Sequence, residues 1–448
     1  MRLWHGSRGA AVCAAVCAAS PASAQHFEGR ASFTAAGTYS RTITDAPSPS
    51  TLALSGPSVS LSPSVSLVYE TPRTTSTLSC AFALNLPFDE DLRLARGPRS
   101  YSQNLRYAGR YEISELTRVS FALSFHHRPS NALDVAADPS QTALDAVPAG
   151  ASYLLGTSAS IGFTRLLSPV LSLTESNGFS FNAPIHPRLV TPKTIGALAS
   201  LSLERQFEVD TLGLMLAVET SYFTAGEAIG AGVIEPRVQL ASTLSGTWTR
   251  ALTEAWRWAI TFGATQVVRP AVETEAAIQP TGTAALTYRF EVAAATLSYA
   301  HQAAPNLATG AVSFTDALTL RFSVPFGETG LLGMGSGGFT RMTPIGSRDG
   351  EPTSTILGDA SLTWRPPISQ SLSLSLRGQV QRQIGGADPL GAFTRVSGSL
   401  NLTYAYPSAA AAAASPMLPP ALGLSMPAPS EGFSRAIEAP NEPPANPR

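Results

Sequence analysis

Charged residues are scarce in this 448-residue chain, where they make up 14% of the sequence. Ordinary soluble domains carry roughly 25%. Lysine occurs once, at Lys193, and the formal net charge is −1. Recognition of nucleic acid needs a basic patch or stripe, so the composition predicts no nucleic-acid partner.

Long apolar runs are also missing, although 44% of the residues are hydrophobic. A membrane-spanning helix needs about 18 or more consecutive apolar residues, and no such stretch is present. Instead, Ser, Thr, Ala and Gly alternate with Leu, Val, Phe and Tyr along most of the chain. This mixture is typical of strands with one apolar face and one small polar face.

The N-terminal segment has the pattern of a secretory signal. The basic residues Arg2 and Arg8 frame its start, the apolar stretch 9–19 follows, and 22–24 reads Ala-Ser-Ala. A basic start, a short apolar region and an A-x-A cleavage site together mark a signal peptide. We therefore predict that residues 1–24 are removed after export.

The body of the chain, residues 25–407, alternates with a period of two, which is the signal for strands. The pattern is clearest over 78–86, 105–113, 212–222 and 318–326. About eighteen such runs can be counted, with a range of about 16–20. Most are about 10–14 residues long, enough for a tilted strand to cross the hydrocarbon layer. Their centres lie near residues 35, 64, 80, 108, 122, 158, 173, 200, 217, 243, 262, 286, 297, 320, 335, 361, 377 and 400.

The connections between these runs alternate between short and long. Bacterial outer-membrane barrels have short periplasmic turns and long extracellular loops, which matches this order. The short connections are expected near 70–74, 114–118, 165–169, 204–210, 249–255, 290–292, 326–330 and 365–370. The long connections are expected near 42–57, 87–102, 128–151, 177–194, 224–235, 269–281, 301–312, 341–354 and 385–393.

The sheet is expected to close into a barrel, because each strand has one side that faces lipid. A strand in lipid cannot leave backbone N–H and C=O groups unpaired. The fold class is therefore all-β, a closed antiparallel transmembrane β-barrel of about 18 strands. Residues 408–448 are rich in Ala and Pro and have few apolar side chains to bury, so they are predicted to form a disordered periplasmic tail.

Large aromatic side chains accompany the predicted short turns. An aromatic girdle at the boundary between lipid and water explains such placement. The aromatic residues concerned are Phe163, Trp248, Trp256, Trp258, Tyr288 and Trp364.

This pattern resembles the Gram-negative outer-membrane β-barrels, over about residues 25–406. The resemblance rests on alternation and loop order, and no residue motif carries it. It implies residence in the outer membrane, contact with membrane lipid and lipopolysaccharide, and insertion by the barrel-assembly machinery. Barrels of this size in that class include sugar porins and exopolysaccharide-secretion barrels. The class usually ends at a terminal aromatic residue, whereas here Tyr404 and Tyr406 are followed by about 40 residues, which departs from the pattern.

Catalytic and cofactor sites are not expected. Ser124 and His126 share one strand face, opposite apolar neighbours, and polar lumen residues explain them better than an outer-membrane lipase would. Gly333, Gly335 and Gly338 fit G-x-G-x-x-G, but the nucleotide fingerprint must open a helix after a strand. No spacing for a metal site is present either, so we predict no enzyme activity, no cofactor and no metal.

Two loops carry opposed charges that could narrow a pore. Acidic and basic groups facing each other across a channel create a transverse field that orients polar solutes. The alternative is that these loops are solvated surface that contacts lipopolysaccharide. The candidate constriction residues in 87–102 are Asp89, Glu90, Asp91, Arg93, Arg96 and Arg99, and those in 128–151 are Asp134, Asp138 and Asp145.

The polar strand face predicts the lining of a water-filled lumen. It is rich in serine, as over 58–66 and 371–375, with arginines scattered among the hydroxyls. The lumen-lining arginines are predicted to be Arg106, Arg110, Arg237, Arg257, Arg321, Arg377 and Arg395. A hydroxyl-rich wall with some arginine suits sugars or acidic polysaccharides.

The function predicted from the sequence is passive diffusion of hydrophilic solutes across the outer membrane. Two alternatives remain open. One is a dedicated translocation pore for exopolysaccharide, whose export partners in the periplasm would dock on the C-terminal tail. The other is a structural or plugged barrel without transport.

Overall fold

The computed structural model describes residues 26–44, 56–88, 100–129, 153–185, 193–228, 232–234, 236–268, 277–290, 292–306, 311–344, 352–366, 369, 371–384 and 392–406. Nearly all of these residues lie in antiparallel strands. Eighteen strands form one sheet and two short ones form a separate hairpin. Among the described residues, no helix is long and apolar enough to cross a membrane.

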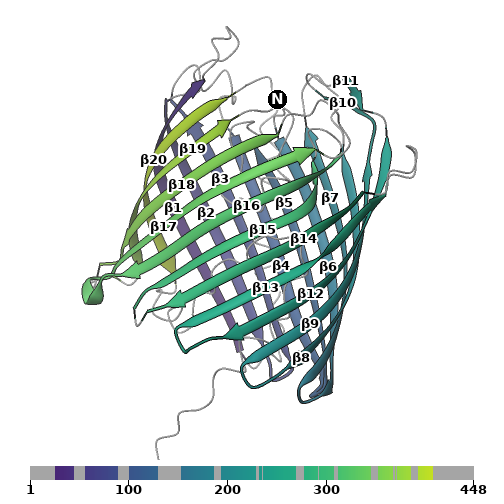
Figure 1. The fold of residues 1–448 in the computed structure, drawn as a ribbon. Helices are drawn as coiled ribbons and strands as arrows, with labels where there is room; N and C mark the ends of the chain where they lie inside the picture. The colour runs from purple at the N-terminus through teal and green to yellow at the C-terminus, as the bar shows by residue number, and fades with distance from the viewer. Residues whose placement is uncertain are drawn as a thin grey trace, which may run out of the picture.

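The eighteen strands of the large sheet follow one another around a ring (Figure 1). Each strand pairs with its neighbour in sequence, except that β9 pairs directly with β12, because β10 and β11 form the separate hairpin. The strands are β1 His26–Thr44, β2 Gly56–Glu70, β3 Thr74–Pro87, β4 Ser100–Ser114, β5 Thr117–Pro129, β6 Tyr153–Ser168, β7 Leu171–Ile185, β8 Thr194–Gln206, β9 Asp210–Phe223, β12 Arg237–Ala251, β13 Trp256–Val268, β14 Ala277–Arg289, β15 Ala294–Asn306, β16 Ala311–Pro325, β17 Leu331–Pro344, β18 Thr353–Trp364, β19 Leu372–Ile384 and β20 Phe393–Tyr406.

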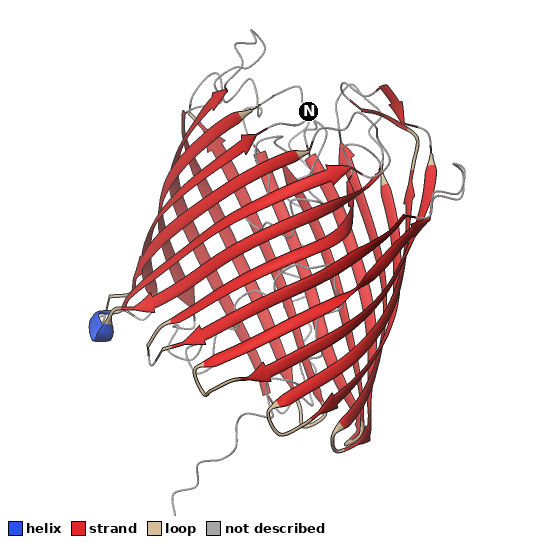
Figure 2. Cartoon of the chain, viewed as in Figure 1, coloured by secondary structure: helices blue, strands red, loops and turns tan. Residues whose placement is uncertain are grey.

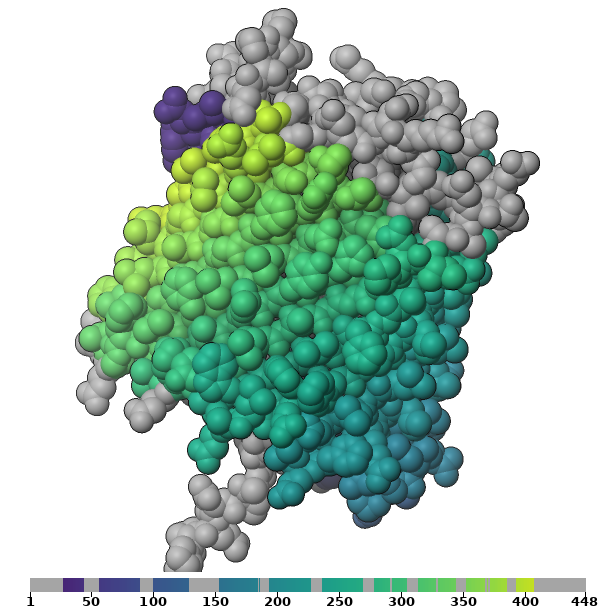
Figure 3. Space-filling model, viewed as in Figure 1, coloured from purple at the N-terminus to yellow at the C-terminus, as the bar shows by residue number. Residues whose placement is uncertain are grey.

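The ring closes because the first strand pairs with the last. Register partners of β1 and β20 run from Ala31 opposite Tyr406 to Thr44 opposite Phe393. The sheet therefore has no free edge, and every strand has two hydrogen-bonded neighbours. In Figure 3 the strands facing the viewer form a continuous surface. The prediction of a closed antiparallel barrel of about 18 strands is confirmed.

The connections also follow the predicted order. Short turns join β2 to β3, β4 to β5, and so on at one end, drawn in tan at the lower end of Figure 2. One of them contains η1, the single turn Gly327–Thr329 drawn in blue. The longer connections lie at the other end, which we call the loop end.

A small hairpin at the loop end was not predicted from the sequence. Strands β10 (Gly226–Ala228) and β11 (Gly232–Ile234) pair within the long connection between β9 and β12. Figure 1 shows this hairpin above the barrel wall. Three-residue strands are too short to produce a period-two signal, which explains why alternation does not find them.

Side chains alternate between an outer and an inner face along every strand. On β1, Phe27, Phe33, Tyr39 and Ile43 are exposed, whereas the even-numbered residues point inward. The same holds around the barrel, where rows of large apolar side chains are exposed, from Leu212, Leu214 and Leu216 on β9 onward. An exposed apolar belt on a closed barrel is the arrangement that a hydrocarbon layer satisfies.

The aromatic residues predicted beside the short turns lie on the outer face, and those of β12, β13 and β14 contact one another. The rings of Trp248 and Trp258 are 4.7 Å apart between centroids, and those of Trp256 and Tyr288 are 4.2 Å apart. Trp364 is exposed near the same end of the barrel. These positions match an interfacial girdle.

Candidate functional site: the inner wall

The inner wall of the barrel is built largely from hydroxyl side chains. Because strand register sets which residues face each other, serines and threonines of neighbouring strands meet in pairs. The hydroxyl oxygens of Ser32 and Ser64 lie 2.6 Å apart, and those of Ser124 and Ser158 lie 2.7 Å apart. Further pairs are Thr34 with Thr403, Thr243 with Thr265 and Thr164 with Thr174. The result is a polar lining in which small hydroxyl side chains predominate.

All seven arginines predicted to line the lumen lie on the inward face of their strands. Arg106 is opposite Ser79, Arg321 is opposite Ser336, and Arg377 is opposite Ser399, all of them on the polar face. Arg106 and Arg377 are exposed there, and the other five are half-buried. The set comprises Arg106, Arg110, Arg237, Arg257, Arg321, Arg377 and Arg395.

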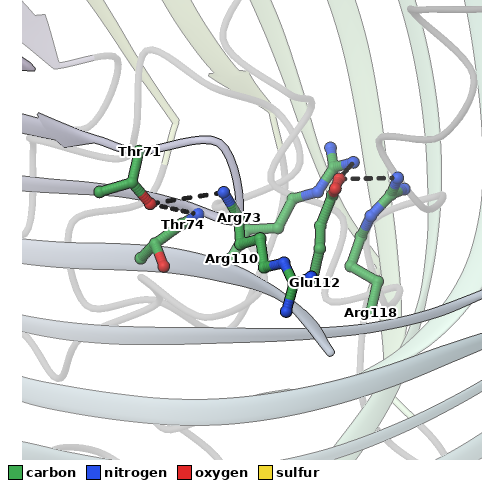
Figure 4. A network of polar contacts seen from close by, with 6 residues as sticks. All are labelled: Thr71, Arg73, Thr74, Arg110, Glu112 and Arg118. Carbon is green, nitrogen blue, oxygen red and sulfur yellow. Dashed lines mark hydrogen bonds and ion pairs between the residues drawn. The ribbon is translucent and has the colours of Figure 1, made fainter. Parts of the chain in front are cut away.

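A charged cluster lies on the inner wall close to the short turns of β2–β3 and β4–β5 (Figure 4). Nitrogen atoms of Arg110 and Arg118 lie 2.9 and 3.3 Å from the same carboxylate oxygen of Glu112. The backbone N–H of Glu112 donates to the carbonyl of Arg73 at 2.7 Å, which ties this strand to the neighbouring turn. Thr71 caps that turn, because its hydroxyl accepts from the N–H of Thr74 at 2.9 Å.

A second charged pair joins β18 to β19. Arg377 lies 3.0 Å from the carboxylate of Asp359, which also accepts a hydrogen bond from Ser336 on β17. Two guanidinium groups share one carboxylate in the first cluster, and one carboxylate holds an arginine and a serine in this one. Carboxylates thus fix the position of arginines on the wall.

Two further inward carboxylates lie half-way round the ring from the Asp359–Arg377 pair. Glu204 on β8 and Glu219 on β9 face inward, opposite Arg377 on β19 and Arg395 on β20 in the strand order. Arg237 lies inward on β12, the strand that pairs with β9, so groups of both charges occur on this side of the lumen.

The inner wall carries more arginines than carboxylates among the described strands. The inward arginines are Arg30, Arg106, Arg110, Arg118, Arg128, Arg237, Arg257, Arg289, Arg321, Arg377 and Arg395. The inward carboxylates are Glu28, Glu70, Glu112, Glu204, Glu219 and Asp359. Arg30, Arg118, Arg128, Arg289, Glu204 and Glu219 were not predicted, although the same alternation places them on the inner face.

Histidine and serine on β5 do not form a catalytic arrangement. Ser124 pairs with Ser158 on β6. The His126 ring lies over Gly156 so closely that a Cβ there would be 2.1 Å from its Cε1 atom, with Asn182 beside it. The glycines of the nucleotide-like motif, Gly333 to Gly338, lie within strand β17.

The inner wall is most buried at the loop end. Gln239, Ser313 and Thr315 are 0–2% exposed and lie within five residues of that end of their strands. Phe223 and Phe393, the inward residues at the tips of β9 and β20, are 0% exposed. Inward residues near the short turns, such as those of 373–375, are only half-buried.

The predicted constriction residues lie outside the described residues, so this hypothesis stays a prediction. They are Asp89, Glu90, Asp91, Arg93, Arg96 and Arg99 of the first loop, and Asp134, Asp138 and Asp145 of the second.

Comparison with known proteins gives matches among solved structures alone. No family model matches the chain, and no curated protein matches it. Pseudomonas aeruginosa OccK2 (OpdF) in complex with glucuronate matches with 13% identity and a TM-score of 0.45, covering 85% of this chain and 98% of that one. Acinetobacter baumannii OccAB3 matches with 9% identity and a TM-score of 0.46, covering 85% and 100%. P. aeruginosa OpdK with vanillate matches with 10% identity and a TM-score of 0.44, covering 85% and 99%.

Proposed function

We propose that this chain is an outer-membrane channel that passes small hydrophilic solutes by passive diffusion, with a preference for anions. The supporting observation is the closed barrel with an apolar outer belt and an inner wall of hydroxyls and arginines. A barrel of this strand number generally leaves space for an aqueous path. The excess of inward arginines attracts anions into it.

The proposal includes a route to the membrane. The signal peptide 1–24 directs export, the assembly machinery inserts the barrel, and lipid with lipopolysaccharide surrounds it. The short turns and the tail 408–448 then lie in the periplasm, and the long connections face outward. Nothing in the described residues favours the polysaccharide-secretion alternative, and we do not propose it.

The path is narrowest in the loop-end half of the lumen. The support is the burial of inward side chains there, compared with the half-exposed wall near the short turns. Solutes therefore meet the narrow part before the charged cluster of Arg110, Glu112 and Arg118 when they enter from outside. Arg128, Arg237 and Arg395 also point inward in the loop-end half, so size and charge act on a solute together there.

The experiment that tests the proposal is single-channel recording of the mature chain in a planar bilayer. Stable conductance steps are expected, with a reversal potential in a salt gradient that reports anion preference. Silence from a folded, heat-modifiable barrel would contradict the channel and favour the plugged alternative.

Solute charge can be tested with two sugars that differ in one carboxylate, glucuronate and glucose. Glucuronate is expected to permeate liposomes containing the protein faster than glucose. Arg106→Gln should reduce this advantage by about twofold or more, because an exposed inward charge is lost. Arg106→Lys retains the charge, and Arg165→Gln removes an arginine from the outer face. If all three variants lost the permeation advantage of glucuronate over glucose equally, charge selection by the inner wall would be contradicted.

A further inference from the structure

Charged side chains on the outer face are unevenly distributed around the loop end. Within the described strands, the outward arginines of this end are Arg41 on β1, Arg341 on β17 and Arg382 on β19. All three are exposed, and no hydrogen bond or ion pair joins any of them to another described residue. We call them the rim arginines. They occupy one sector, because closure places β1 beside β20.

The rim arginines lie at similar depth and regular spacing. Each is two or three residues from the loop end of its strand. Alternate strands carry them, with β18 and β20 between, so neighbouring rim arginines are about 10 Å apart across the sheet. A guanidinium recognises phosphate through paired N–H groups, and a row at this spacing can hold more than one phosphate.

Their height matches the edge of a hydrocarbon layer. Arg382 follows eight residues after Leu374, the register partner of the girdle residue Trp364. With about 3.3 Å per residue and a tilt of about 40°, that separation spans about 20 Å along the membrane normal. The apolar band of such barrels is about 25 Å tall. A long arginine side chain at this level reaches the headgroups.

Apolar side chains lie beside and below the rim arginines on the same face. Val396 is the register partner of Arg41, and Ile356 is the register partner of Arg382. Val396, Ile356 and Phe339 are 40–50% exposed. This combination of a basic row over an apolar strip is complementary to a lipid that has an anionic head and acyl chains.

One acidic residue borders the sector. Asp316 on β16 is the register partner of Arg341, but its carboxylate is held by Tyr299 at 2.8 Å and His301 at 2.7 Å. No ion pair between Asp316 and Arg341 is present in the described strands. Arg341 interacts electrostatically with Asp316, but its guanidinium N–H groups form no hydrogen bond within the described strands and can donate to a ligand.

We propose that the rim arginines bind a phosphorylated lipid headgroup of the leaflet that surrounds the loop end. The acyl chains of this lipid lie on the strip formed by Phe339, Ile356 and Val396. The inference rests on the membrane location in the proposed function. The inference goes beyond the proposed function by assigning a specific lipid site to one sector of the outer wall, from β17 to β1.

Native mass spectrometry of the full chain in a neutral detergent tests this site, with dioleoyl phosphatidic acid as the probe and dioleoyl phosphatidylcholine as the uncharged comparison. The wild-type chain is expected to retain phosphatidic acid selectively. Each arginine near an anionic surface contributes about fivefold, so the triple variant R41Q/R341Q/R382Q should weaken binding on the order of 100-fold.

The matched control is R165Q/R205Q/R250Q, which removes three outward arginines near the short turns. It should bind phosphatidic acid as the wild type does. Equal retention by the rim variant and the wild type would refute the site. The site would also be refuted if inorganic phosphate displaced bound phosphatidic acid as effectively as free phosphatidic acid does. In that case the apolar strip of Phe339, Ile356 and Val396 would contribute nothing to binding.

Folding and channel function are checked on the same samples by heat-modifiability and conductance. If the triple variant does not fold, the single variant R382Q should still show about fivefold weaker lipid binding, and unchanged binding by it would refute the site. Loss of lipid binding with conductance retained separates this inference from the proposed function. Lipid binding by a silent barrel supports the site while contradicting the channel.

Discussion

Arg377 of β19 and Asp359 of β18 form an ion pair across neighbouring strands of the inner wall, with 3.0 Å between a guanidinium nitrogen and a carboxylate oxygen. The side chain of Asp359 is 18% exposed and that of Arg377 is 43% exposed. The carboxylate is thus the more enclosed partner, and the arginine reaches into the lumen. The pair decides how much positive charge this part of the wall presents to a solute.

Replacement of Asp359 by Asn should increase the anion preference of the channel. The variant leaves Arg377 without its counter-charge, so the lumen becomes more positive. The reversal potential in a salt gradient measures the change. Glu175→Gln, which removes a carboxylate from the outer face of β7, is the matched control and should leave selectivity unchanged. A D359N channel with the selectivity of the wild type would show that this pair lies off the solute path.

Gly263→Ala should destabilise the barrel. A Cβ added to Gly263 would lie 2.2 Å from the backbone oxygen of Leu244, and backbone cannot move away without disturbing the β12–β13 pairing. Overpacking of this kind costs about 1–3 kcal/mol. The effect is measured as the temperature at which the folded barrel converts to the unfolded form, which is seen as a change in electrophoretic mobility. At Gly37, where nothing lies within 4 Å of an added Cβ, the same substitution should be neutral, and equal losses at both sites would exclude the steric explanation.

Cysteine labelling on intact cells should establish the orientation of the barrel. Lys193 and Glu254 are both exposed, the first beside the loop end of β8 and the second in the turn between β12 and β13. A membrane-impermeant maleimide is expected to modify Lys193→Cys and to spare Glu254→Cys until the cells are lysed. The opposite pattern would mean that the short turns face outward.

Deletion of residues 408–448 should leave insertion and conductance intact. The closing strand β20 ends at Tyr406, so every described pairing between β20 and β1 is retained. Heat-modifiability of the shortened chain in outer-membrane fractions measures insertion. Loss of the inserted form would show that the tail takes part in assembly. A full-length chain with a scrambled tail would then show whether assembly depends on the sequence of the tail or only on its length.

The sequence by itself determined the strands, their faces and the order of the connections, because these depend on local alternation and on local turn residues. The weak runs near 173 and 335 are strands β7 and β17, as predicted. The inward placement of Arg106 and Arg377 also follows from alternation, because successive side chains on a strand point to opposite faces of the sheet.

Only the tertiary structure decided which charged groups meet. Arg118 joins Glu112, and Arg377 joins Asp359, through cross-strand register, which alternation within one strand does not specify. Closure of the ring brings Arg41 of the first strand into one sector with Arg382 of β19, more than three hundred residues away in sequence. Charge pairing and the rim site are properties of neighbouring strands, whereas alternation is a property of each strand alone.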